Sequence, residues 1–202
     1  MKKALAFLMA AVMLMSMLTA CGNKDNAADT NDADNNNVNT EETDKAAADK
    51  VAALIDAIYV QERTEETDAQ CEAAKAAWDA LTDAQKALVE GEEASPDYFG
   101  LDTGDASKDD PRNQDEIGEN ELLVVSFGTS FNDSRVEDIK AIEDALQEAY
   151  PDWSVRRAFT AQIIINHVQA RDGEKIDNMQ QALDRAVANG VKNLIVQPTH
   201  LM

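Results

Sequence analysis

The segment Leu122–Phe127, with the sequence Leu-Leu-Val-Val-Ser-Phe, is an almost continuous apolar run that ends at Gly128. A run that does not alternate between apolar and polar residues is typical of a strand buried on both faces of a parallel sheet. Parallel strands need long crossover connections, which are usually helices. This run therefore predicts that the chain contains an α/β domain.

The residues after this run alternate between helix and strand patterns. Ser134 and Glu137 have the spacing of a capping box, and Asp177 stands where it could cap a later helix. The resulting order β-α-β-α-α-β requires right-handed crossovers and predicts a three-layer α/β domain with a parallel sheet over residues 120–202. The expected helices cover residues 134–149, 161–171 and 178–189, and the further strands cover 153–159 and 193–197.

Three short polar segments follow the predicted strands: 128–130, 159–160 and 198–200. The carboxyl ends of parallel strands share one edge, and ligands bind there in open α/β sheets. The glycine, hydroxyls and helix amino end of the first segment suit a carboxylate-bearing ligand, although a tight turn with capping hydroxyls accounts for them equally well. No P-loop, dinucleotide glycine motif or G-x-S-x-G setting is present, so we expect neither a nucleotide cofactor nor a serine hydrolase.

Four motifs in this region resemble those of the anaerobic cobalt chelatases, the small class II sirohydrochlorin cobaltochelatases. They are S-F-G-T-S at 126–130, R-A-F-T at 157–160, R-D-G at 171–173 and Q-P-T-H at 197–200. The resemblance implies a chelatase-like fold of two similar α/β halves with the tetrapyrrole between them, of which residues 120–202 are the first half. It also implies ATP-independent insertion of Co²⁺, with Fe²⁺ or Ni²⁺ as alternative metals, into sirohydrochlorin on the anaerobic route to cobalamin.

The resemblance also implies where the metal ligands lie. The catalytic histidine of the family, and the glutamate and second histidine that help to hold the metal, belong to its second half. We expect these ligands to lie beyond Met202, the last residue of this sequence, so no catalytic residue is assigned in this chain. His200 is only a weak candidate for a metal ligand, and His167 is expected to pack or to lie at the surface.

The substrate-binding residues are implied by the same four motifs. They are Gly128, Thr129, Ser130, Arg157, Thr160 and His200. Among them, Arg157 is the expected partner of a substrate carboxylate.

The predicted sheet has only three strands and ends on an apolar strand, which would expose one edge and one face. We therefore expect the 202 residues to be an amino-terminal fragment of a longer protein, and the fragment alone to be inactive.

Residues 1–20 have the pattern of a lipoprotein signal peptide. Lys2 and Lys3 precede the apolar run Ala4–Met17, which is short for a membrane span, and the following Leu-Thr-Ala-Cys resembles a bacterial lipobox. We expect Cys21 to be lipidated, so that the protein is exported and anchored at the periplasmic or outer face of the cell membrane. Cys71 would then be a lone thiol, most simply buried.

Residues 21–119 separate this anchor from the α/β domain. An Asn/Asp-rich tether (21–45) and an acidic linker (92–119) are expected to be disordered. Between them, residues 46–91 predict a small three-helix module, with a capping box at Thr82. This module is most simply a spacer; the alternative is a binding or dimerising module.

The charge of the chain excludes one class of partner. It has 39 acidic and 18 basic residues, a formal net charge of -21, which repels nucleic acids. Two functions from different classes remain: a cobaltochelatase, or an exported tetrapyrrole- or metal-binding lipoprotein that reuses the fold without catalysis. The expected partners are the tetrapyrrole sirohydrochlorin and, through the lipid, the membrane, and both functions allow a homo-oligomer.

Overall fold

The computed structural model describes residues 32–99 and 103–200, with side chains from residue 40 onward. Residues 37–202 form one compact unit, and residues 1–36 belong to another. The predicted signal peptide, Cys21 and Met202 lie outside the described residues, so the expectation that the family's metal ligands lie beyond Met202 stays a prediction. Within the described residues, none of the helices has both the length and the apolar character needed to cross a membrane.

The first part of the chain is helical. Helix α1 (Asp32–Ile58) is followed by α2 (Thr67–Asp79) and the short α3 (Asp83–Lys86). Because α1 begins at Asp32, it includes part of the segment for which the sequence predicted disorder.

These helices enclose an apolar core. Ile55 of α1 and Cys71 of α2 are fully buried in it, and Trp78 packs edge-on against Phe99 with 5.3 Å between ring centroids. Thr82 caps α3 through the expected capping box, accepting a hydrogen bond from the backbone N–H of Gln85. The module therefore shares its apolar core with residues 94–99 and with Ala170 of the α/β part.

The second part contains a three-stranded parallel sheet of β1 (Asn120–Ser126), β2 (Ser154–Phe159) and β3 (Asn193–Pro198). The strand order is β2-β1-β3, so the first strand of the sequence lies in the centre. This central strand contains residues 122–126 of the apolar run, which are buried on both faces, whereas Phe127 lies beyond the strand and is exposed. The predicted α/β class and parallel sheet are confirmed.

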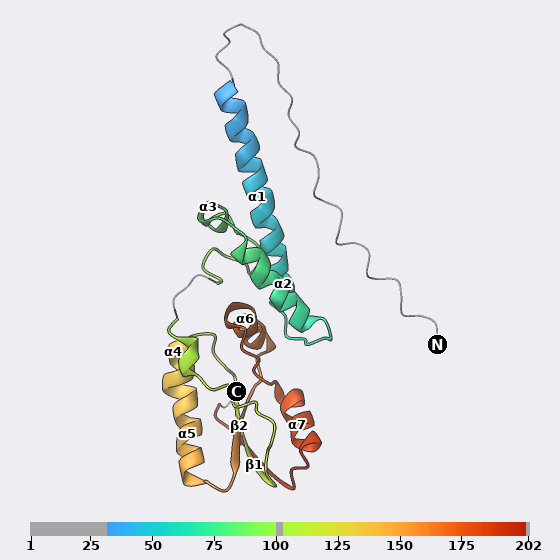
Figure 1. Ribbon diagram of the computed structural model, residues 1–202, viewed down its shortest axis with the longest axis vertical. Coiled ribbons are helices and arrows are strands. Elements are labelled where there is room, and N and C mark those ends of the chain that lie inside the picture. Colours follow the sequence, from blue (N-terminus) through green and yellow to red (C-terminus); the bar gives the residue numbers. More distant parts are fainter. Residues whose placement is uncertain (1–31, 100–102, 201–202) are drawn as a thin grey trace, which may run out of the picture. The chain divides into compact units, whose positions relative to one another are not determined.

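Helices cover both faces of the sheet (Figure 1). On one face Leu122 and Val124 pack with Leu146 of α5 (Lys140–Ala149); on the other Leu123 packs with Ala182 of α7 (Met179–Ala188). Neighbouring residues pack on opposite faces because successive side chains of a strand point to opposite sides of the sheet. The remaining elements are the 3-10 turn η1 (Ala106–Lys108), α4 (Asn132–Ser134), the π-helical turn η2 (Arg135–Ile139) and α6 (Gln162–Asp172).

Two predicted helix caps are wrong. Ser134 lies inside the helical segment, whose N-cap position is Phe131. Asn178, rather than Asp177, caps α7, through a capping box with Gln181. Asp177 does not cap because its carboxylate accepts hydrogen bonds from the Arg156 and Arg185 guanidinium groups.

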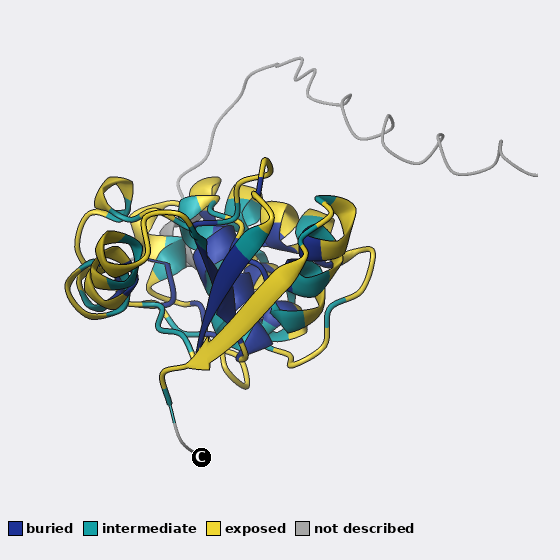
Figure 2. Ribbon diagram, turned by 90° about the horizontal axis from the view of Figure 1, so that it is seen from below, coloured by how far each residue is buried: buried dark blue, intermediate teal, exposed yellow. Residues whose placement is uncertain are grey.

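Strand β3 differs from its neighbours in exposure. All six of its residues are exposed, whereas β1 and β2 are almost entirely buried (Figure 2). Ile195 keeps 49% of its surface exposed, and Leu194 and Val196 are similar. One edge of the sheet thus presents an apolar strand to solvent.

The helical module is packed against the α/β part along α6. The side-chain amide of Asn166 donates to the carbonyl of Ile58 (2.9 Å), and the Gln169 amide donates to Asp68 (2.9 Å). The Cys71 thiol donates to the backbone carbonyl of Asn166 (3.5 Å). The segment from residue 103 to 118 also runs along the α/β part, where Asp109 and Arg112 are buried.

Candidate functional site

The turn after β1 depends on Gly128. Its φ of +99° lies in the left-handed region, and a Cβ added there would stand 2.5 Å from the ring of Phe159. Any side chain at this position would be strained and would collide with β2. In the same turn the Thr129 hydroxyl accepts a hydrogen bond from the backbone N–H of Phe131 (3.1 Å). The sequence therefore specifies a close, fixed turn at the carboxyl end of the central strand.

Most of the predicted site residues lie together at this edge of the sheet. The backbone N–H of Thr160 donates to the carbonyl of Ser126 (3.0 Å), which places the end of β2 beside the Gly128 turn. The chain after β3 reaches the same place, because the ring of His200 lies 6.3 Å from that of Phe127, centroid to centroid. The motifs that end the three strands thus converge, as the parallel sheet requires.

Arg157 lies elsewhere. It points to the α5 face of the sheet, where its guanidinium is fully buried and donates to Glu143 (2.8 Å) and Asp109 (2.7 and 2.9 Å). Burial alone would lower the pKa of Arg157, but the two carboxylates raise it above the ordinary value. A guanidinium held in this way is not available to a substrate carboxylate.

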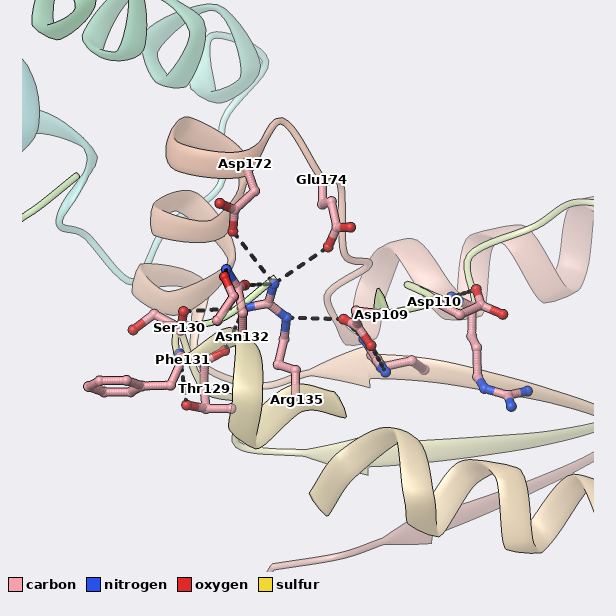
Figure 3. Close-up of polar contacts among 12 residues, drawn as sticks. Asp109, Asp110, Thr129, Ser130, Phe131, Asn132, Arg135, Asp172 and Glu174 are labelled. Carbon is pink, nitrogen blue, oxygen red and sulfur yellow. Dashed lines mark hydrogen bonds and ion pairs between the residues drawn. The ribbon is translucent and has the colours of Figure 1, made fainter. Parts of the chain in front are cut away.

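A second arginine, which lies outside the four sequence motifs, holds the turn instead. Arg135 is fully buried, and its Nη1 donates to the backbone carbonyls of Thr129 (3.4 Å) and Ser130 (3.3 Å). Its Nη2 donates to the side-chain oxygen of Asn132. Figure 3 shows this guanidinium surrounded by acceptors from the turn and by carboxylates. The sequence feature that could have indicated a role for Arg135 is its position shortly after the S-F-G-T-S motif.

The R-D-G motif meets the same turn. Arg171 lies in the last turn of α6 and donates from Nη2 to the carbonyl of Ser130 (2.6 Å) and to Asp172 (2.7 Å). Gly173 ends the helix with φ of +76°, a left-handed conformation that glycine adopts without strain. Two motifs that are well separated in the sequence are therefore parts of one structure.

A cavity of about 250 Å³ adjoins Ser130 and Arg171. Its lining includes His167 of α6 and Tyr98, whose rings stack with their centroids 4.2 Å apart. Burial lowers the pKa of His167 from 6.5 to about 4, and the charge of Arg171 adds to this lowering. His167 is therefore neutral at pH 7.

The described residues contain no cluster of side chains that could bind a metal ion. Among residues 40–99 and 103–200, no three His, Cys, Asp or Glu side chains are arranged so that they could hold a metal ion. The ring of His200 lies near the candidate edge, and His167 lies in the cavity on α6.

The comparisons with known proteins concern the α/β part. Residues 120–202 match the family model described as Cobalt chelatase (CbiK). Over 81 residues the chain is 42% identical to the sirohydrochlorin cobaltochelatase of Salmonella typhimurium strain LT2, a match that covers 40% of this chain and 31% of that relative. The chain thus spans less than a third of the length of the curated relative. Residues 120–202 are thus similar to the cobalt chelatase (CbiK) family, in agreement with the resemblance of the four motifs.

Proposed function

We propose that this chain binds sirohydrochlorin at the strand-end edge of its α/β part and serves the ATP-independent insertion of Co²⁺ into that tetrapyrrole. One observation carries the proposal: in a segment of the chelatase type, the Gly128 turn, Thr160 and His200 converge at the edge where α/β sheets bind ligands. Sirohydrochlorin, which the relative's name specifies, carries carboxylates. The hydroxyls and backbone N–H groups of this edge are suitable donors for them.

The metal chemistry needs groups beyond these donors. Co²⁺ is a substrate of the reaction, and its entry requires that the pyrrole nitrogens lose protons to a base. We propose that the described residues orient the tetrapyrrole, and that the metal ligands and the base come from a part of the protein that the structure does not describe. The 31% coverage of the relative is compatible with this division of labour.

An anaerobic absorbance titration tests the binding step. The chain is added to sirohydrochlorin, first alone and then with Co²⁺, with the Salmonella relative as the positive control. We expect a saturable spectral change without Co²⁺ and no conversion to the cobalt complex by this chain. A spectrum that does not change at any protein concentration would contradict the proposal.

The amino-terminal motif favours a second candidate, an exported tetrapyrrole-binding lipoprotein without catalysis. Its lipobox-like end predicts that Cys21 is exported and lipidated, whereas cobalamin synthesis is normally cytoplasmic. Incorporation of labelled fatty acid in cells, lost in Cys21→Ser, would establish the anchor. Cobalt insertion by the whole protein would then exclude a binding role alone, and binding without insertion would favour it.

A further inference from the structure

Asp109 is a buried carboxylate outside the segment that matches the chelatase family. It follows η1, within the acidic segment that precedes β1, and its side chain is 0% exposed. Its Oδ2 accepts from Nε of Arg135 (3.0 Å), and its two oxygens accept from both terminal nitrogens of Arg157 (2.7 and 2.9 Å). One carboxylate therefore joins two buried arginines.

The two arginines have different roles. Arg157 has a second carboxylate, because Glu143 accepts two further hydrogen bonds from it. Arg135 reaches the turn after β1, where it donates to the carbonyls of Thr129 and Ser130. A buried hydrogen bond that involves two charged partners is short, directional and stronger than a neutral one. Asp109 thus helps to fix the position of the Arg135 guanidinium, and through it the position of the turn.

The same acidic segment contacts the chain just after the turn. The backbone N–H of Asp133 donates to the carbonyl of Thr103 (2.7 Å), and the Asn132 amide donates to the carbonyl of Gly104 (3.2 Å). Gly104 has φ of +101°, and a Cβ there would stand 1.9 Å from the Asp133 side chain. The segment therefore fits closely against the start of α4 and holds it at a second point.

Electrostatics make Asp109 an effective anchor. Burial would raise the pKa of its carboxyl, but hydrogen bonds and charge interactions with Arg157 and Arg135 hold that pKa below the ordinary value. Asp172 and Glu174 also lie near the Arg135 guanidinium, at 3.5 and 3.6 Å, but both are partly exposed (Figure 3). The ion pairs of Arg157 are with Asp109 and Glu143. Within the described residues, Asp109 is the carboxylate that binds both arginines.

We propose that Asp109 is a positioning residue for tetrapyrrole binding: through Arg135 it holds the turn 128–130 in the conformation that receives the substrate. This inference rests on the proposed function, and it extends the functional unit to a segment that precedes the family match. Asp109 itself does not touch the substrate.

The test compares Asp109→Asn with Asp177→Asn. Asp177 is a matched control, since its side chain is 4% exposed and binds two arginines, Arg156 and Arg185, on the other face of the sheet. Two quantities are measured on the whole chain: hydrogen exchange of the peptide covering residues 127–135, and the dissociation constant for sirohydrochlorin. Both variants are first checked by circular dichroism and thermal unfolding.

For Asp109→Asn we expect faster exchange of that peptide and about tenfold weaker binding, because the neutral amide loses the charge-assisted hydrogen bonds that hold Arg135. Asp177→Asn should leave the exchange of that peptide and the binding within about twofold of wild type, because its arginines do not reach the turn. Should Asp109→Asn fail to fold, Arg135→Lys replaces it. The shorter reach of the ammonium group loses the carbonyl contacts and keeps the charge.

Equal effects of the two Asp→Asn variants on both quantities would show that Asp109 acts only through global stability, and would overturn the inference. Faster exchange with unchanged affinity would also overturn it. If the wild-type chain does not bind sirohydrochlorin, the proposed function fails, and the exchange comparison alone decides whether Asp109 positions the turn.

Discussion

Single residues determine the geometry at the candidate edge. Gly128 permits the turn, Arg135 and Arg171 bind its carbonyls, and His167 lies neutral in the neighbouring cavity. The Gly128 turn lies beside the end of β2, because a parallel sheet brings its strand ends together, and the binding roles of Gly128, Ser130 and Thr160 stay predictions. The sequence motifs did not indicate that Arg157 would be engaged by buried carboxylates, since both partners are distant in sequence.

Replacement of Gly128 by alanine should destabilise the folded protein. Gly128→Ala is expected to lower the free energy of unfolding by about 2–4 kcal/mol, because φ is +99° and the new Cβ meets the Phe159 ring. Gly118→Ala is the matched control, since the nearest atom to its added Cβ is 4.0 Å away. Urea unfolding of both variants measures the difference. Similar losses at the two glycines would contradict this account of the turn.

His167 should make stability depend on pH. Its folded pKa of about 4 lies below the ordinary 6.5, so between these values the unfolded chain binds a proton that the folded chain does not. Stability should therefore fall as the pH falls from 6.5 to 4, by up to about 3 kcal/mol from this residue, and this contribution should level off below pH 4.

The His167→Phe variant keeps a ring that can stack on Tyr98 and removes this proton. The difference in unfolding free energy between wild type and variant, measured by urea titration from about pH 7 to about pH 4.5, isolates the histidine from the acidic groups. His200→Gln is the control for the second histidine. A difference that stays constant with pH would refute the assignment.

At the scale of elements, the helical module and α6 form one packed structure. Asn166 and Gln169 on one face of α6 bind groups of the module, and Ala170 belongs to the module's apolar core. Whether the module serves as a spacer stays a prediction. A spacer that folds independently would not bury polar groups of α6.

Two tryptophans can test this coupling. Trp78 lies in the module core and Trp153 beside the sheet, and the chain has no other tryptophan. In the single-tryptophan variants Trp78→Phe and Trp153→Phe, we expect far-UV dichroism and the remaining fluorescence to give coincident unfolding midpoints, as in a two-state unit. A fluorescence midpoint that departs from the dichroism midpoint in either variant would show that the module unfolds separately.

The elements themselves were largely predictable from sequence. The three strands, the helices after each of the first two strands and the capping box at Thr82 follow from local periodicity and cap chemistry. The caps predicted at Ser134 and Asp177 are wrong: Ser134 lies within the helical segment, and the Asp177 carboxylate is bound by two arginines that local cap chemistry does not reveal. The same holds for the acidic segment before β1: its composition resembles a linker, and only the buried arginines give its carboxylates a structural role.

At the scale of the whole molecule, the apolar edge strand should govern association. β3 pairs only with β1 in the described part of the chain, and Ile195 is 49% exposed. Unpaired strand edges with apolar side chains associate with other strands. We expect the purified chain to sediment as concentration-dependent oligomers, and Ile195→Lys to shift it towards monomer.

The control for this shift is Val187→Lys. Val187 is an even more exposed apolar residue (80%), but it lies on α7, where the backbone hydrogen bonds are satisfied within the helix. Sedimentation velocity of the three proteins over a range of concentrations makes the comparison. An equal response to both lysines would indicate general surface hydrophobicity, and not strand pairing.

The ion pairs of Asp109 also bear on where the smallest stable piece of this protein begins. The stretch that identifies it as chelatase-like begins at residue 120, yet Arg135 and Arg157, inside that stretch, have a carboxylate partner that comes before it. A chelatase segment joined to an unrelated leader would keep two buried positive charges with one partner removed, which is strongly destabilising. The stretch that must stay together to keep these charges paired therefore begins before residue 120, earlier than the stretch that matches the family.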